Sequence, residues 1–128
     1  MSKTWIYKFG GASVKDTVAL KNLAEILRNR LRNNLIIVVS AMGKTTNALE
    51  GILTNKLKGL DFSENSAILK FFHREICEEL FPEGHTVFAQ VDNLFALLEN
   101  QLEKPLSRDN YDEYYDQVVC FGELISSK

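Results

Sequence analysis

The stretch Lys8-Phe9-Gly10-Gly11-Ala12-Ser13-Val14 decides the fold, because it joins the end of a short apolar segment to a glycine turn and then to a helix start. Two consecutive glycines let backbone N–H groups approach an anion, since no Cβ blocks them and positive φ angles are allowed. Lys8 adds a positive charge, and a helix that begins near Lys15-Asp16 would direct its unpaired N–H groups to the same place. Taken by itself, a lone Gly-Gly pair is more often a tight turn than a phosphate site.

The segments around this stretch predict a β-α-β unit. Residues Thr4 to Phe9 are rich in aromatic and β-branched types and too few for a helix, which favours a strand. A helix pattern starts at Asp16, which is placed to cap it, and ends at Asn33-Asn34. Its apolar positions are Leu20, Leu23, Leu27 and Leu31. Leu35 to Val39 is apolar without alternation, as in a strand that is buried on both faces of a parallel sheet. Both glycine-bearing loops then lie beyond the carboxyl ends of the strands, where such folds bind ligands.

The rest of the chain is expected to be mostly helical. After a loop from Ser40 to Thr46, a helix should run from Asn47 to Gly59, with Thr46 as its N-cap on the residue pattern alone. A four-residue apolar repeat then predicts another helix, whose buried positions would be Ile68, Phe72, Ile76 and Leu80.

Two further helices are expected in the carboxyl-terminal third. Pro82-Glu83-Gly84 predicts a turn, after which Thr86 caps a helix that ends at Lys104-Pro105. The last helix starts near Asp109, and one of its sides would carry Tyr111, Tyr114 or Tyr115, Val118 and Ile125.

Composition restricts the classes of partner. With 15 basic and 17 acidic residues among 128, the charge favours neither nucleic acid nor a polybasic membrane contact. The longest aliphatic run, Leu35 to Val39, is too short to span a bilayer, so one domain in the cytoplasm with a small-molecule partner is expected. We interpret Cys77 and Cys120 as reduced core thiols, and His73 and His85 as surface residues without a catalytic partner.

Two common nucleotide motifs fail on spacing. Gly43-Lys44-Thr45 matches the end of a P-loop, but the first glycine of that motif would fall on Val38, inside the second strand. Gly10-Gly11 has no third glycine at the spacing of the dinucleotide fingerprint.

Three segments together resemble aspartate kinases of the amino-acid kinase family. They are the opening Lys8-Phe9-Gly10-Gly11, the loop segment Val38 to Asn47, and Phe121-Gly122-Glu123-Leu124-Ile125-Ser126-Ser127 near the end. Ala12 stands where the family usually has a hydroxyl residue, so a hydrogen bond from that side chain would be missing, whereas Ser13 is present.

The resemblance implies an α/β fold of the carbamate kinase type with three αβα layers. Residues 1–128 would be the amino-terminal portion of the catalytic domain, without the ATP-binding half and the regulatory domains. It further implies ATP with Mg²⁺ as cofactors, L-aspartate as the acceptor, and a homo-oligomer that binds neither nucleic acid nor membrane. We expect the 128-residue chain alone to be inactive.

The resemblance also assigns roles to residues. Lys8 would be catalytic and would bind phosphate together with Gly10, Gly11, Ala12 and Ser13. The residues that bind the amino-acid substrate would be Ser40, Thr46 and Glu123, with the carboxylate of Glu123 in an apolar setting where it pairs with the α-ammonium group. The alternatives are a relative that acts on glutamate, acetylglutamate or a nucleoside monophosphate, and a non-catalytic assembly module.

Overall fold

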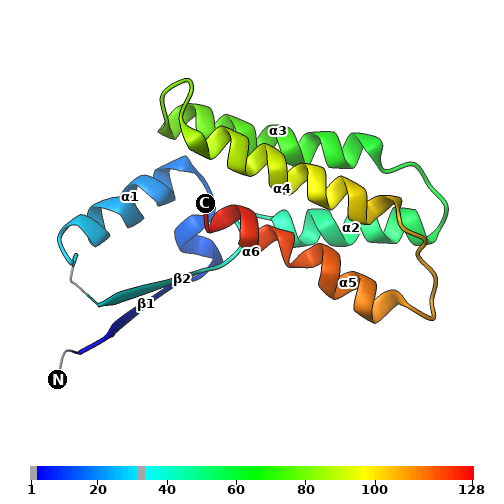
Figure 1. The fold of residues 1–128 in the computed structure, drawn as a ribbon, viewed down its shortest axis with the longest axis horizontal. Helices are drawn as coiled ribbons and strands as arrows, with labels where there is room; N and C mark the ends of the chain where they lie inside the picture. Colours follow the sequence, from blue (N-terminus) through cyan, green and yellow to red (C-terminus); the bar gives the residue numbers. More distant parts are fainter. Residues whose placement is uncertain (1–2, 32–33) are drawn as a thin grey trace.

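A β-α-β unit forms the amino-terminal part of the chain, as the sequence predicts. The computed structural model describes residues 3–31 and 34–128. Strand β1 (Trp5–Phe9) leads through the 3₁₀ turn η1 (Gly11–Val14) to helix α1 (Thr17–Arg28) and strand β2 (Leu35–Val39). The strands are parallel and in register from Trp5 opposite Leu35 to Phe9 opposite Val39 (Figure 1). The predicted strands and their pairing are therefore confirmed.

Helix α1 has the predicted start but an earlier end. The carboxylate of Asp16 accepts a hydrogen bond from the Ala19 N–H at 2.8 Å, which caps the helix. The helix stops at Arg28 because the next residues turn tightly, with the Arg30 N–H donating to the Leu27 carbonyl. Leu31 lies beyond the helix and is 71% exposed, so its assignment to the apolar side of the helix was wrong. Of the predicted end Asn33-Asn34, Asn33 lies outside the described residues.

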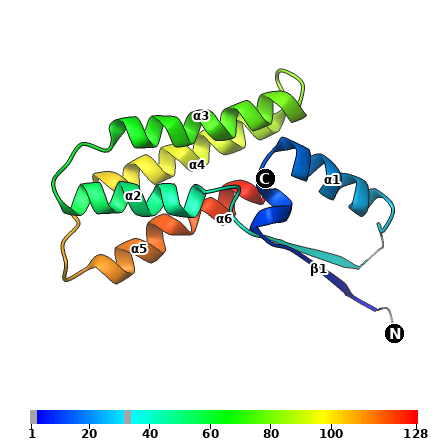
Figure 2. The same cartoon turned by 180° about the vertical axis from the view of Figure 1, so that it is seen from behind.

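Five helices pack into a bundle at the other side of the molecule (Figures 1 and 2). They are α2 (Thr45–Leu57), α3 (Ser63–Leu80), α4 (Thr86–Glu103), α5 (Tyr111–Val119) and α6 (Phe121–Ser126). The fully buried apolar side chains at the centre of this bundle come from α2, α4 and α5: Leu49, Ile52, Leu53, Phe95, Leu98 and Val118. Hydrophobic burial thus lies mainly in the helical part, not around the sheet.

Several helix boundaries differ from the predictions. Helix α2 begins at Thr45, two residues before the predicted start, and Lys44 rather than Thr46 occupies the N-cap position. The cap of α4 is His85, whose ring Nδ1 accepts from the Val87 N–H at 3.0 Å, and Thr86 is the first helical residue. Gly59, with φ of +71°, follows the end of α2, and α4 ends before Lys104-Pro105, as predicted.

The last helix is two helices. The chain is interrupted at Cys120, whose N–H points to the Val118 carbonyl, and α6 then restarts at Phe121. Cys120 is exposed at this break, so the prediction of a core thiol was wrong there, whereas Cys77 is buried as expected. Burial also raises the pKa of the Cys77 thiol, which keeps it protonated.

Helix α3 buries only part of the predicted side: Ile76 is buried as expected, Phe72 and Leu80 are partly buried, and Ile68 is exposed. Ile68 is 62% exposed, and the buried positions are Leu69, His73, Ile76 and Cys77. Two apolar stripes overlap in this sequence, and the packing of α3 against α2 and α4 selects the one that contains the histidine. His73 is therefore a core residue, which corrects its assignment to the surface, whereas His85 is exposed as expected.

Strand β2 is not buried on both faces by the residues that the structure describes. Ile36, Ile37 and Val38 each remain between 43% and 50% exposed, and Ile6, which pairs with Ile36, is 65% exposed. Successive side chains of a strand alternate between faces, so the even-numbered positions of both strands share one open face of the sheet. The apolar composition of β2 predicted burial on both faces, but among residues 3–31 and 34–128 no layer covers these side chains fully.

Candidate functional site

The three segments that resemble the family meet at the carboxyl edge of the sheet. The N–H of Ser40 donates to the carbonyl of Phe9 at 3.1 Å, which extends the parallel pairing by one residue beyond β2. The loops that begin at Gly10 and at Ser40 therefore leave the sheet side by side. Both loops thus lie where the sequence predicts them, beyond the carboxyl ends of the strands.

The glycine loop, residues 10–13, is an open turn, and the buried side chain of Val14 anchors its end. The N–H of Ser13 donates to the Gly10 carbonyl at 2.9 Å, and Val14 is completely buried. Neither Gly10 nor Gly11 has a positive φ, so the loop does not use the conformational freedom that glycine allows. A Cβ on either glycine would meet no atom within 4 Å, so the approach to the backbone is open. The residues of the predicted phosphate loop are all exposed: Gly10, Gly11, Ala12 and Ser13.

Lys8 stands at the end of β1 on the open, even-numbered face of the sheet. It is opposite Val38 in the strand register, and its side chain is exposed. An exposed ammonium group two residues before Gly10 could reach an anion at the glycine loop, since a lysine side chain is long and flexible.

Gly43 lies in the loop that follows β2 and packs against the residue that follows the glycine loop. Its φ is +51°, a conformation that favours glycine. A Cβ at Gly43 would lie 3.0 Å from the backbone oxygen of Lys15 and 3.2 Å from the ring of Phe72. The loop from Ser40 to Lys44 is thus packed between the residue that follows η1 and helix α3.

Thr46 lies in the first turn of α2, where it is partly exposed. Its neighbour Thr45 is buried, and the Thr45 Oγ1 lies 3.3 Å from Nε2 of His73. Nδ1 of His73 lies 2.9 Å from the carbonyl oxygen of Leu69. Burial lowers the pKa of the imidazole below its ordinary value, although the hydrogen bond to Leu69 opposes this shift.

Gly122 brings the third segment to the same place. A Cβ on Gly122 would lie 2.8 Å from the Cβ of Ala41 and 3.4 Å from Cγ2 of Thr45, so only glycine allows α6 to approach the start of α2 this closely. The next residue, Glu123, therefore lies near the first turn of α2. Its side chain is exposed, which differs from the apolar setting that the sequence predicts.

Sequence reasoning missed the residues that hold these segments together. His73, Thr45 and Gly122 are the packing partners of the predicted site residues. A glycine inside a helix costs free energy relative to alanine, which is a signal for a close backbone approach at Gly122. The spacing of His73 from Leu69 and Ile76 places all three on one side of a helix, and this pattern could have indicated burial.

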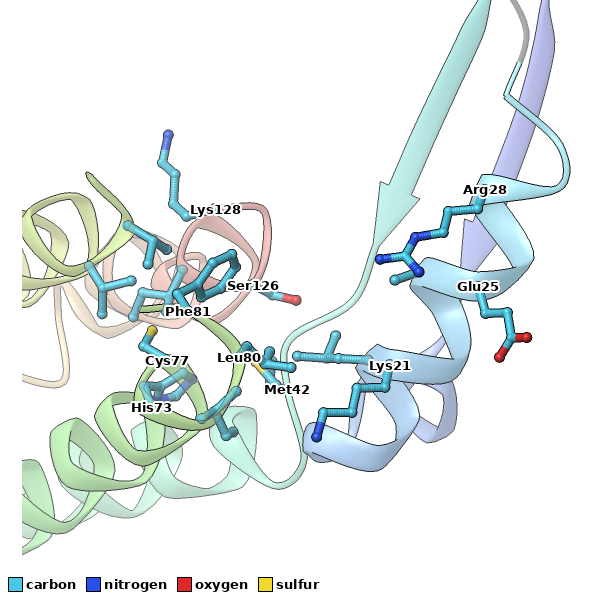
Figure 3. A pocket seen from close by; sticks show the side chains of 16 residues that line it. Lys21, Glu25, Arg28, Met42, His73, Cys77, Leu80, Phe81, Ser126 and Lys128 are labelled. Atoms are coloured by element: carbon cyan, nitrogen blue, oxygen red, sulfur yellow. The ribbon is translucent and has the colours of Figure 1, made fainter. Parts of the chain in front are cut away.

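A separate cavity of about 630 Å³ lies between α1 and the helices α3, α4 and α6. Figure 3 shows Lys21, Glu25 and Arg28 of α1 on one side of it and His73, Cys77 and Phe81 on the other. None of the predicted phosphate-binding or substrate-binding residues lines this cavity. The candidate site is the open edge where the loops meet, not this hollow.

The described residues offer no complete set of protein ligands for Mg²⁺, the metal that the family resemblance implies. In the part of the chain that the structure describes, no three His, Cys, Asp or Glu side chains lie close enough together to hold a metal ion. We therefore name no ligands for Mg²⁺ among these residues and assign no step to the metal. Within residues 3–31 and 34–128, no helix has both the length and the apolar character needed to cross a membrane.

Comparison with known proteins agrees with this arrangement. The sequence profile of the Amino acid kinase family matches residues 3–128. The chain belongs to the amino acid kinase family. Its relatives in this family include Aspartokinase 2, chloroplastic, of Arabidopsis thaliana, which is 30% identical over 130 residues that cover 98% of this chain and 23% of the relative. Another is the bifunctional aspartokinase/homoserine dehydrogenase 2 of Escherichia coli, which is 29% identical over 126 residues that cover 96% of this chain and 15% of the relative.

Solved aspartokinase structures confirm the α/β fold class. Aspartokinase III of E. coli in complex with lysine and aspartate superimposes with a TM-score of 0.77 at 24% identity, over 98% of this chain and 27% of that structure. The same enzyme in complex with aspartate and ADP gives a TM-score of 0.76 at 24% identity and the same coverage. The chain thus spans about a quarter of the length of these amino acid kinase family members.

Proposed function

We propose that residues 1–128 form the amino-terminal portion of the catalytic domain of an aspartate kinase. The reaction would transfer the γ-phosphoryl group of ATP to the side-chain carboxylate of L-aspartate and give 4-phospho-L-aspartate, the first step of lysine, threonine and methionine biosynthesis. The observation that carries this proposal is the meeting of three segments, at Gly10, Ser40 and Gly122, at one edge of the parallel sheet. Aspartokinase relatives over nearly the whole chain support the choice of substrate.

Lys8 and the glycine loop would bind the transferring phosphoryl group. No covalent enzyme intermediate is needed, so the protein has to align the two substrates and neutralise charge on the phosphoryl oxygens. The open backbone of Gly10 and Gly11 would donate N–H groups, and the exposed ammonium group of Lys8 would supply positive charge. Ala12 and Ser13 complete the loop, and only Ser13 can add a hydroxyl group.

The amino-acid substrate would bind between α2 and α6. The carboxylate of Glu123 would pair with the α-ammonium group of aspartate, and the hydroxyl groups of Ser40 and Thr46 would orient the substrate. The close approach at Gly122 supports this assignment, because it brings Glu123 beside the turn that carries Thr46.

A longer chain would complete the site. This chain spans only 23% of Aspartokinase 2, and its β2 side chains are uncovered where a further layer would pack. We therefore propose a parent protein in which polypeptide beyond Lys128 covers the sheet and binds the adenine and ribose. Sequencing the reading frame past the codon for Lys128 tests directly whether such a parent protein exists.

Replacement of Lys8 tests the phosphoryl role in the parent protein. Lys8→Ala should lower kcat by about a hundredfold or more with a modest change in the aspartate KM, because the lost charge acts mainly on the transition state. Lys21→Ala, at an exposed lysine of α1, is the matched control and should retain kcat. Unchanged turnover in Lys8→Ala would remove this residue from the mechanism.

Replacement of Glu123 tests the substrate. Glu123→Gln keeps the shape and removes the charge. In a parent protein whose further polypeptide shields the site from solvent, loss of such a pair costs about 2–5 kcal/mol, so the aspartate KM should rise far more than the ATP KM. The unmodified protein should prefer aspartate to glutamate and acetylglutamate in the same assay. A rise in the ATP KM alone would contradict the assignment.

A further inference from the structure

The buried pair Thr45 and His73 has a defined donor and acceptor. Each side chain is 1% exposed, and they join α2 to α3 across 28 residues of sequence. The carbonyl oxygen of Leu69 can only accept, so the proton of the neutral ring lies on Nδ1. Nε2 is then an acceptor, and the hydroxyl group of Thr45 donates to it. Each polar atom of the ring has one partner, which removes the freedom of the Thr45 side chain.

The ring neighbours of His73 are aromatic, and the imidazole also lines the cavity that Lys21, Glu25 and Arg28 line from α1. The His73 ring meets the rings of Phe72 and Phe95 edge to face, with centroids 5.1 and 5.6 Å away. Polar groups cost free energy when they are buried, and the hydrogen bonds offset that cost only while their geometry is kept. A buried pair of this kind therefore resists a shift of α2 relative to α3 more sharply than apolar contacts would.

Thr45 also contacts the third segment. On the side away from the hydroxyl group, its Cγ2 faces Gly122, where a Cβ would come within 3.4 Å. Thr45 is thus fixed between α3 and α6, with Thr46 as its chain neighbour and Glu123 as the neighbour of Gly122. Within residues 3–31 and 34–128, no side-chain hydrogen bond of Thr46 or Glu123 is present, so neither is held by a bond of its own.

We propose that the Thr45–His73 hydrogen bond positions Thr46 and Glu123 for the amino-acid substrate. The inference rests on the proposed function, which assigns substrate contacts to those two residues. Thr45 and His73 are positioning residues, since neither needs to touch the substrate. The bond fixes the first turn of α2, and the contact of Thr45 with Gly122 fixes α6 against that turn.

Two substitutions at Thr45 separate the hydroxyl group from the shape of the side chain. Thr45→Val keeps the shape and removes the donor, whereas Thr45→Ser keeps the donor and removes the methyl group. In the parent protein, Thr45→Val should raise the aspartate KM about tenfold and leave the ATP KM within about twofold, because small displacements of substrate-binding groups are costly. Thr45→Ser keeps the hydrogen bond to His73 and loses only the Cγ2 contact with Gly122, so its aspartate KM should rise clearly less than that of Thr45→Val. A purely structural role would lower thermal stability without this split between the two KM values.

Nuclear magnetic resonance on the 128-residue chain tests the geometry independently of turnover. Thr45→Val should shift the Nε2 resonance of His73 and the amide signals of Thr46 and Glu123, and Thr45→Ser should restore the His73 resonance and the Thr46 amide signal. Changes confined to His73, or an equal rise in both KM values, would overturn the proposal. His73→Leu, which removes the acceptor for the Thr45 hydroxyl group, serves the same comparison should Thr45→Val not fold. Absence of turnover in the unmodified parent protein would refute the proposed function instead, and the resonance comparison would still decide the positioning.

Discussion

Glycines at the candidate site serve three different purposes. Gly43 adopts a positive φ, Gly10 and Gly11 leave open space above their backbone, and Gly122 permits a close approach of α6 to Ala41. The sequence alone assigns the same flexibility to all of them. Only the packed structure shows that a larger residue would clash at Gly122, whereas the backbone of Gly10 and Gly11 is open to a ligand.

Alanine at position 122 should loosen the candidate site. A Cβ there would lie 2.8 Å from the Cβ of Ala41, closer than carbon atoms pack, so Gly122→Ala should lower the free energy of unfolding by about 1–3 kcal/mol. Gly51→Ala in α2 is the matched control, because its Cβ would meet nothing within 4 Å, and it should raise stability by about 0.5–1 kcal/mol. Urea unfolding of both variants measures the difference. Equal stability of the two variants would contradict the close approach.

At the scale of elements, the sequence predicts those features that depend only on neighbouring residues, such as strand formation and helix capping. Leu35–Val39 is a strand because a short β-branched run has no other favourable structure, and Asp16 caps α1 because its side chain reaches the next turn. The buried side of α3 is not a local property, since Ile68 and Leu69 are equally apolar and the partner helices choose between them. The motif segments were predictable from the sequence. The spacing of His73 from Leu69 and Ile76 gives a signal for burial, but the partner of its ring, Thr45, lies 28 residues away in the sequence and could not be predicted from local pattern.

Acidic pH should lower the stability that His73 contributes to the packing of α2 against α3. Burial lowers the pKa of His73 from its ordinary value of 6.5, so the unfolded chain binds a proton more readily than the folded chain. The stability contribution of the neutral ring is therefore complete above pH 6.5 and decreases as the pH falls through the interval down to the folded-state pKa. Urea unfolding between about pH 7.5 and about pH 5 should show this loss, and His73→Gln should flatten the slope. If the free energy of unfolding of His73→Gln fell with pH as steeply as that of the unmodified chain, the imidazole would not be the source of the loss.

At the scale of the whole molecule, the two parts of the chain differ in how they are covered. The helical part surrounds a core that includes Phe95 and Leu98, both fully buried, whereas the two-stranded sheet extends from it with apolar side chains in contact with solvent (Figures 1 and 2). An isolated pair of strands is marginally stable in water, and exposed strand edges favour pairing with another chain. The open face that carries Lys8 also carries Ile6, Ile36 and Val38. A layer that covered this face would therefore also lie beside Lys8.

The isolated 128-residue chain should associate with itself and show no aspartate-dependent release of ADP. Association would hide the exposed sheet, and activity would be missing because the chain spans about a quarter of the aspartokinases it resembles. Light scattering should therefore report a dimer or a larger species, and a variant with both Ile36→Lys and Val38→Lys should be shifted towards monomer, since charged residues on an open face oppose pairing. A coupled assay on the same samples measures ADP release. A monodisperse monomer of the unmodified chain would contradict the association, and steady turnover that Lys8→Ala abolishes would contradict the inactivity.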